Sequence, residues 1–195
     1  MADVAGRIQR GREAEIVEAQ TNDVEIMTHD FGGEPIEPTP VFHIRRLNRP
    51  GRQATLKTNE ISERPVPIHQ AVCDEGFLRY VQEIRDTSYG GGHGPLFPQF
   101  KMWNGRLNHD ASKRLMDWLR DVAEIKEPKK VFHSWRHTLK TRFRGVDAEG
   151  RHFIEREDVS DKLTGHAKGL IGRTYGYFPI AVLHNAISRV PNWID

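Results

Sequence analysis

The sequence predicts an α+β fold that is mainly α-helical, with a small antiparallel β-sheet near the N-terminal third. Beyond residue 75, apolar residues recur at helical spacing. Earlier in the chain, two short runs of β-forming residues flank a group of turn residues. A chain of 195 residues with 37% hydrophobic content can bury one core. We therefore expect a single domain over residues 1–195.

The N-terminal third is expected to hold one helix and a β-hairpin. Residues 12–20 are good helix formers with little to break them. Residues 30–40 are rich in glycine and proline and predict a loop. The segments 41–44 and 53–57 predict short strands, because Asn-Arg-Pro-Gly turn residues lie between them. The Pro-Val-Pro segment at 65–67 ends this extended region.

The rest of the chain is predicted to be mostly helical. Residues 75–86 carry four apolar side chains at helical spacing, namely Phe77, Leu78, Val81 and Ile84. A glycine-rich loop follows over 88–95. Further helices are expected from about residue 108 or 110, over about 134–144, over about 156–163, and over 180–188.

The composition indicates a globular chain with a polar surface. No apolar run reaches membrane-spanning length, and the N-terminus lacks the apolar core of a secretion signal. The single cysteine, Cys73, excludes an internal disulfide and fits a reducing cytoplasm. We therefore expect a cytoplasmic protein without a membrane partner. The formal net charge of +2 does not by itself indicate a nucleic-acid partner.

Charged residues are unevenly distributed along the chain. One basic run consists of Arg45, Arg46, Arg49, Arg52 and Lys57. A second consists of Lys126, Lys129, Lys130, Arg136, Lys140, Arg142 and Arg144. Acidic residues gather over 13–37 and 149–161. This separation favours one positive face that follows phosphates, and the alternative is that the charges are solvated and have no partner.

The first candidate catalytic residues lie in the run His133-Ser134-Trp135-Arg136-His137. His133 and Arg136 share a helix face, so both can reach one anion. The planar guanidinium of Arg136 suits a phosphate, although a solvated surface arginine is the alternative. His133 and His137 also have the spacing of a zinc pair, but Ser134 stands where a metalloprotease needs glutamate. We therefore expect no metal.

Two more candidates follow on the C-terminal side. Gly165 is expected to end a helix in a sharp turn that places His166 near backbone donors. A purely structural turn histidine is the alternative. Tyr175 lies among glycines and before a proline, which is unusual for a tyrosine of a helical core. As a nucleophile its phenol needs cationic neighbours or a base, because its ordinary pKa is about 10.

Two upstream residues complete the set. Lys57 at the end of a predicted strand can reach into a DNA minor groove, although an edge-strand lysine also protects against aggregation. Arg12 opens the first predicted helix, with Glu15 three residues later. In isolation, Arg12 is read as a helix-surface charge.

Together these segments resemble the catalytic domain of the tyrosine recombinase (phage integrase) family, from Arg12 to about Arg189. The resemblance is carried by five segments: His133-x-x-Arg136, Leu163-x-Gly-His166, Tyr175, Lys57-Thr58 followed by Ser62, Arg64 and Val66-Pro67-Ile68, and Arg12-x-x-Glu15-Ile16 followed by Asp23-Val24. The last segment lacks the Thr-Gly that the family places before its first arginine, and Arg10 is the fallback for Arg12.

The resemblance implies site-specific DNA cleavage and rejoining, in the integration or excision of a phage or mobile element. Tyr175 attacks the scissile phosphate and forms a 3′-phosphotyrosyl link, while Lys57 protonates the departing 5′-hydroxyl. Arg12 and Arg136 clamp the non-bridging oxygens. His133 and His166 hydrogen-bond the phosphate, and His133 can also accept the phenolic proton. The resemblance implies no metal and no cofactor.

The resemblance also implies double-stranded DNA as the partner, self-association on DNA, and a bacterial cytoplasm near the nucleoid. The expected DNA-binding residues are Arg45, Arg46, Arg52 and Lys140. Because few residues precede Arg12, we expect the family's N-terminal core-binding domain to be absent and DNA binding to be weak and salt-sensitive. Residues 178–195 form a tail that this family often exchanges with a neighbouring subunit. Packing of this tail on its own domain is the alternative.

Two other functions are kept as alternatives. One is a catalytically inactive, recombinase-derived module that binds DNA or a protein, which the missing domain and the near-neutral charge favour. The other is a metal-dependent nuclease that uses His133 and His137, which a chelator would inactivate.

Overall fold

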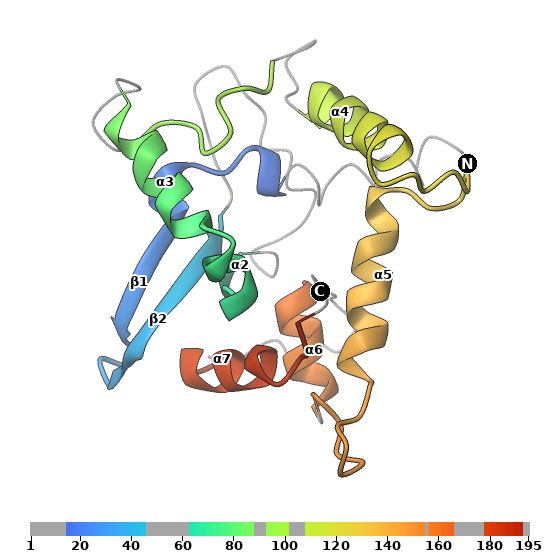
Figure 1. The fold of residues 1–195 in the computed structure, drawn as a ribbon. Coiled ribbons are helices and arrows are strands. Elements are labelled where there is room, and N and C mark those ends of the chain that lie inside the picture. The colour runs from blue at the N-terminus through green and yellow to red at the C-terminus, as the bar shows by residue number, and fades with distance from the viewer. Residues whose placement is uncertain are drawn as a thin grey trace.

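The computed structural model describes residues 15–45, 63–87, 93–101, 108–154, 156–165 and 178–192. These residues form a mixed α+β structure in which helices pack beside a small antiparallel sheet (Figure 1). The predicted fold class is therefore confirmed at this coarse level.

The sheet is built from three segments that are adjacent in sequence order. A short 3-10 helix, η1 (Thr21–Asp23), leads into β1 (Val24–His29). β1 forms a hairpin with β2 (Pro35–Ile44), and β3 (Arg64–Pro67) pairs with the other side of β2. The order β1-β2-β3 places β2 in the middle and leaves the start of β3 near the helices.

The prediction of a loop over residues 30–40 is wrong, because β2 starts at Pro35 and its first half pairs with β1. The reason lies in the position of the prolines. β3 pairs only with Val41–Ile44, so Pro35 and Pro38 lie where β2 has one neighbouring strand. Proline lacks an N–H and is tolerated at such an open side. The strand expected over 41–44 is confirmed, while its expected partner at 53–57 lies outside the described residues.

Helices account for most of the remaining described chain. Their bounds are α2 (Gln70–Asp74), α3 (Phe77–Asp86), α4 (Asn108–Asp121), α5 (Phe132–Phe143), α6 (Glu157–Thr164) and α7 (Ile180–Ser188). Apart from the short α2, all were expected from helical spacing, and their ends differ from the prediction by a few residues. Of the helix expected over 12–20, residues 15–17 are helical. None of the described helices has both the length and the apolar character to cross a membrane.

The two larger of three buried clusters hold most of the described elements together. The first joins α5, α6 and α7 through Phe143, Ile154, Val159, Leu163, Leu183 and Val190. The second lies between the sheet and α3 and contains Ala19, Val24, Ile68, Val81 and Leu96. Burial of apolar side chains is the main stabilising contribution in both places.

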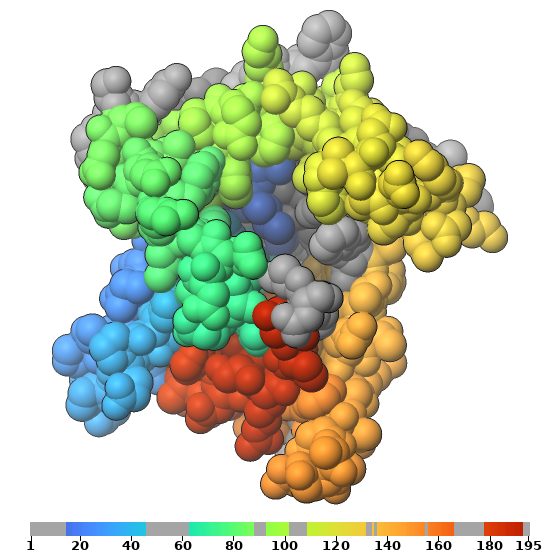
Figure 2. All heavy atoms as spheres, in the orientation of Figure 1, coloured from blue at the N-terminus to red at the C-terminus, as the bar shows by residue number. Residues whose placement is uncertain are grey.

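The C-terminal segment packs against the sheet and thereby joins the two clusters. α7 contacts β2, β3 and α6, and Figure 2 shows it filling the space between the β1–β2 hairpin and the orange helices. At its start, Ile180 N donates to Asp30 Oδ1 (3.2 Å). Beyond its end, His69 Nε2 lies 2.9 Å from Val190 O. Exchange of this tail between copies of the chain stays a prediction.

Candidate functional site

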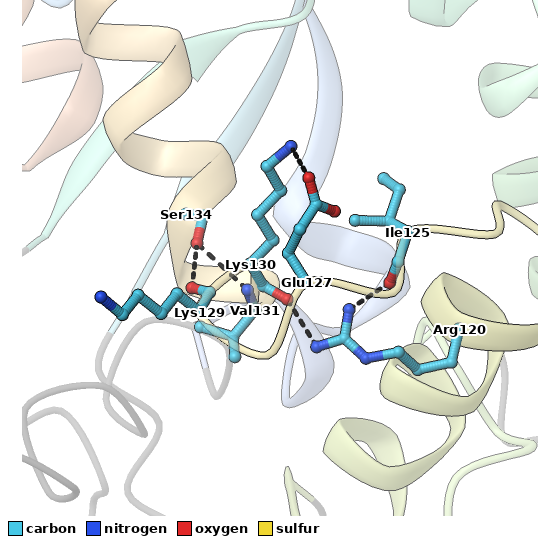
Figure 3. Close-up of polar contacts among 7 residues, drawn as sticks. All are labelled: Arg120, Ile125, Glu127, Lys129, Lys130, Val131 and Ser134. Atoms are coloured by element: carbon cyan, nitrogen blue, oxygen red, sulfur yellow. Dashed lines mark hydrogen bonds and ion pairs between the residues drawn. The ribbon is translucent and has the colours of Figure 1, made fainter.

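The start of α5, which carries His133 and Arg136, is fixed by a network of hydrogen bonds with the preceding loop (Figure 3). Arg120 at the end of α4 donates to the carbonyl oxygens of Ile125 and Lys130, the latter at 2.8 Å. A guanidinium that bridges two carbonyls of one loop restricts the path of that loop.

A second set of contacts determines where α5 begins. Val131 N donates to Ser134 Oγ (3.1 Å), and Ser134 Oγ in turn lies 3.4 Å from Lys129 O (Figure 3). A hydroxyl that accepts a bond from the backbone before the first turn stabilises a helix N-terminus. The serine that argues against a metalloprotease motif is therefore part of the helix cap.

The predicted site residues of α5 differ in exposure. Arg136 is half-buried, and its Nη2 atom is shielded from solvent. His137 is exposed. The backbone of His133 lies in the first turn of the helix, while its side chain lies outside the description. Arg136 is thus held partly inside the protein, which favours a specific role over that of a solvated charge.

α5 and α6 are joined by two ion pairs. Lys140 Nζ contacts Asp161 Oδ1, and the two side chains are 14% and 16% exposed. Arg144 Nη2 lies 3.9 Å from Glu157 Oε1, and both of these side chains are exposed. The pairing of 140 with 161 and of 144 with 157 shows that the two helices run antiparallel.

The same spacing relates Arg136 to the end of α6. Each helical turn back along α5 corresponds to one turn forward along α6. Arg136 lies one turn before Lys140 on α5, and Gly165 lies one turn after Asp161, directly after the end of α6. His166 is the next residue in the chain. Continued by one turn, this register predicts that Arg136 lies near the end of α6.

Gly165 ends α6 in the left-handed conformation, with φ +66°. The guanidinium of Arg64 lies directly against it. A Cβ built on Gly165 would be 2.5 Å from Arg64 Nη1 and 2.7 Å from Nη2, which is too close for any side chain. Both the backbone conformation and the neighbouring guanidinium therefore require glycine at this position.

Arg64 is held in place by a buried ion pair. Its Nη2 donates to Glu15 Oε2 (3.1 Å), and the two side chains are 5% and 8% exposed. Glu15 follows Arg12 by three residues, which is about one helical turn. Burial, and then the charge of Arg64, lower the pKa of Lys162 on α6. Two basic side chains, Arg64 and Lys162, therefore lie close together near the end of α6.

The described contacts thus bring together parts of three predicted motifs: residues 15–17, the strand that begins at Arg64, and the turn at Gly165. The motifs contain Glu15 and Arg64, but sequence reasoning did not predict that they pair. The residues are 49 positions apart, and no local pattern indicates such a contact.

Several predicted residues lie outside the described part of the chain. These are Arg12, Arg46, Arg52, Lys57, His166 and Tyr175. Of the described candidates for DNA binding, Arg45 is exposed and lies 3.7 Å from the buried carboxylate of Asp23. Lys140 is engaged with Asp161, so a contact with phosphate requires it to leave that partner. Among the described residues, no group of three or more His, Cys, Asp or Glu side chains is placed to hold a metal ion.

Comparison with known proteins finds no match to a family model, a curated protein or a solved structure. The resemblance to tyrosine recombinases therefore rests on the motif residues alone and stays a prediction.

Proposed function

We propose that this chain is a tyrosine-type, site-specific DNA strand transferase. The observation that carries the proposal is the meeting of separate motif segments around Gly165. Arg64 lies against Gly165 and pairs with Glu15, which joins two of these segments to the turn, and the register of α5 against α6 predicts that Arg136 lies nearby. The candidate histidine His166 follows that glycine directly.

In the proposed reaction, the phenolic oxygen of Tyr175 attacks the scissile phosphorus and the bond to the 5′ oxygen breaks. His133 accepts the phenolic proton, and Lys57 donates a proton to the leaving 5′-hydroxyl. Arg12, Arg136 and His166 stabilise the charge on the non-bridging oxygens. Phosphoryl transfer depends mainly on such positioning and charge stabilisation. Rejoining reverses the steps with a 5′-hydroxyl as the nucleophile.

The electrostatics of the described part support an anionic ligand. Arg64 and Lys162 lie toward the C-terminal end of α6, and Glu15 is the carboxylate that pairs with Arg64 there. A partly buried excess of positive charge attracts phosphate more strongly than an exposed one, because solvent screens it less.

Covalent trapping tests the proposal. The substrate is a pool of duplexes with randomised sequence around a fixed nick, so that the short cleaved fragment diffuses away and the reaction cannot reverse. We expect a protein–DNA adduct that resists denaturation and whose peptide mass places the nucleotide on Tyr175. Tyr175→Phe should give no adduct. Tyr177→Phe is the matched control, because it removes the same hydroxyl two residues away and should retain the adduct.

The outcomes separate the candidate functions. An adduct that depends on Tyr175 supports the strand transferase. DNA binding without an adduct in the wild-type chain overturns it and supports the DNA-binding module. An adduct that persists in Tyr175→Phe overturns the assignment of the nucleophile.

A further inference from the structure

Arg64 connects three parts of the chain that are far apart in sequence. It begins β3, where it pairs in register with Ile44 of β2. Its guanidinium reaches Glu15 and lies against Gly165 at the end of α6. The side chain is nearly fully buried, so it has little freedom to take another position.

We propose that Arg64 is a positioning residue that fixes the direction in which the chain leaves α6 toward His166. The effect of Arg64 on catalysis rests on the proposed function, since in that function His166 contacts the phosphate. The structural part of the proposal concerns the turn at Gly165 and can be tested without DNA.

The geometry explains why an arginine occupies this position. The flat guanidinium covers the Cα of Gly165 and at the same time donates to Glu15, which a single ammonium group cannot do. The turn cannot move toward Arg64, because the two groups are already in contact. Any movement of the turn away from Arg64 opens a gap beside a buried charge, which is costly.

The charge of Arg64 also suits the end of a helix. The last carbonyl groups of α6 carry partial negative charge, and cations near a helix C-terminus are favourable. Lys162 in the last turn is close enough to Arg64 for the guanidinium to lower its pKa. Two cations therefore lie at this helix end, and Glu15 orients one of them.

Arg64→Lys tests the proposal, because it keeps the charge and removes the flat, two-pronged group. We expect the rate of adduct formation in a single turnover to fall about 100-fold, since small displacements of reacting groups have effects of this size. DNA affinity should stay unchanged. The substitution thus slows the chemical step and leaves DNA binding intact. General destabilisation of the fold does not give this result if the variant is shown to be folded.

Hydrogen exchange provides a readout that is independent of activity. In Arg64→Lys, the amides of residues 164–167 should exchange faster, while those of β1 and β2 keep their rates. Arg85→Lys is the matched control, because Arg85 is a half-buried arginine that joins α3 to the start of β1. It should leave exchange at 164–167 and adduct formation unchanged.

These measurements separate the two proposals. If the wild-type chain forms no adduct but Arg64→Lys speeds exchange at 164–167, the proposed function fails and the positioning role stands. If exchange at 164–167 and the cleavage rate both stay at the wild-type level, the positioning role is overturned. If Arg64→Lys does not fold, Glu15→Gln replaces it, because it keeps the guanidinium and weakens its anchor. Unchanged exchange in that variant also overturns the proposal.

Discussion

The region between the sheet and α3 and the region around α6 differ in how they use buried charge. In the first, Arg85 donates to the backbone oxygens of Thr21 (2.7 Å) and Val24, so a cation satisfies neutral groups at the start of β1. In the second, Arg64 is paired with the carboxylate of Glu15 inside the protein. Both arginines join distant segments, but only the second brings two opposite charges out of water.

This difference indicates what each region does. Desolvating an ion pair costs free energy that apolar packing avoids, so a buried pair is weak support for stability alone. Arg64 lies against Gly165, which precedes a candidate site residue, while Arg85 donates to the backbone at the start of β1. We infer that the pair of Arg64 and Glu15 serves to define the geometry of the turn at Gly165.

The largest effect is expected from removing one partner of the buried pair. Glu15→Ala should lower the free energy of unfolding by about 3–5 kcal/mol, because it removes the carboxylate from a buried guanidinium. Arg85→Ala should cost about 1–3 kcal/mol, because it leaves two backbone acceptors without their donor. Urea unfolding measures both. Equal losses would remove the distinction between the two regions.

Glycine substitutions test whether the guanidinium of Arg64 restricts the turn at Gly165. Gly165→Ala should cost about 2–4 kcal/mol, since it adds an overlap with Arg64 to the strain of a positive φ. Gly150 has φ +77° and no neighbouring atom within 4 Å of a built Cβ, so Gly150→Ala carries the strain alone and should cost about 1–2 kcal/mol. Thermal unfolding of the two variants gives the difference, and the same loss in both would contradict the contact with Arg64.

The two ion pairs between α5 and α6 should differ in strength. Lys140→Met keeps the aliphatic stem and removes the charge beside Asp161, and we expect a loss of about 1.5–3 kcal/mol in the free energy of unfolding. Arg144→Met removes the exposed pair with Glu157 and should change stability too little to measure. A larger effect of Arg144→Met would show that burial does not decide the strength of these pairs.

The smallest effect concerns pH and the sheet. Burial lowers the pKa of His43, although Glu25 Oε1 lies 2.6 Å from Nε2 and opposes the shift. The fold therefore favours the neutral ring, and the contribution of His43 is full above the unfolded pKa of about 6.5 and declines as pH falls through it. The stability advantage of the wild-type chain over His43→Gln should shrink between pH 7.5 and pH 5, as followed by urea unfolding. An advantage that grows on acidification would contradict the direction of the shift.

Local patterns predicted the helices well, because the spacing of apolar residues reports directly on a helix face. α5 and α6 are within a few residues of the expected bounds. β1 was missed and the first half of β2 was read as a loop, because Pro35 and Pro38 are strand breakers unless one side of the strand is open. Whether one side of β2 is open depends on how far β3 pairs along it, and this is determined by the tertiary structure.

The sequence predicted which segments belong to the candidate site. It did not predict how these segments contact one another. The motif around Gly165 indicates a helix end, which the positive φ confirms. The contact of Arg64 with that glycine and the ion pair of Arg64 with Glu15 depend on how strands and helices pack. Their partners are too distant in sequence for any periodicity to indicate them.

The two hydrogen-bonded contacts at the ends of α7 affect the timing of folding. They join positions separated by 150 and 121 residues, so α7 can pack on the sheet only after residues 178–190 have been synthesised. Contacts of such long range close slowly. Until Val190 has been synthesised, the strands expose the apolar face that α7 later covers. During this interval the chain is most prone to aggregate and most accessible to chaperones.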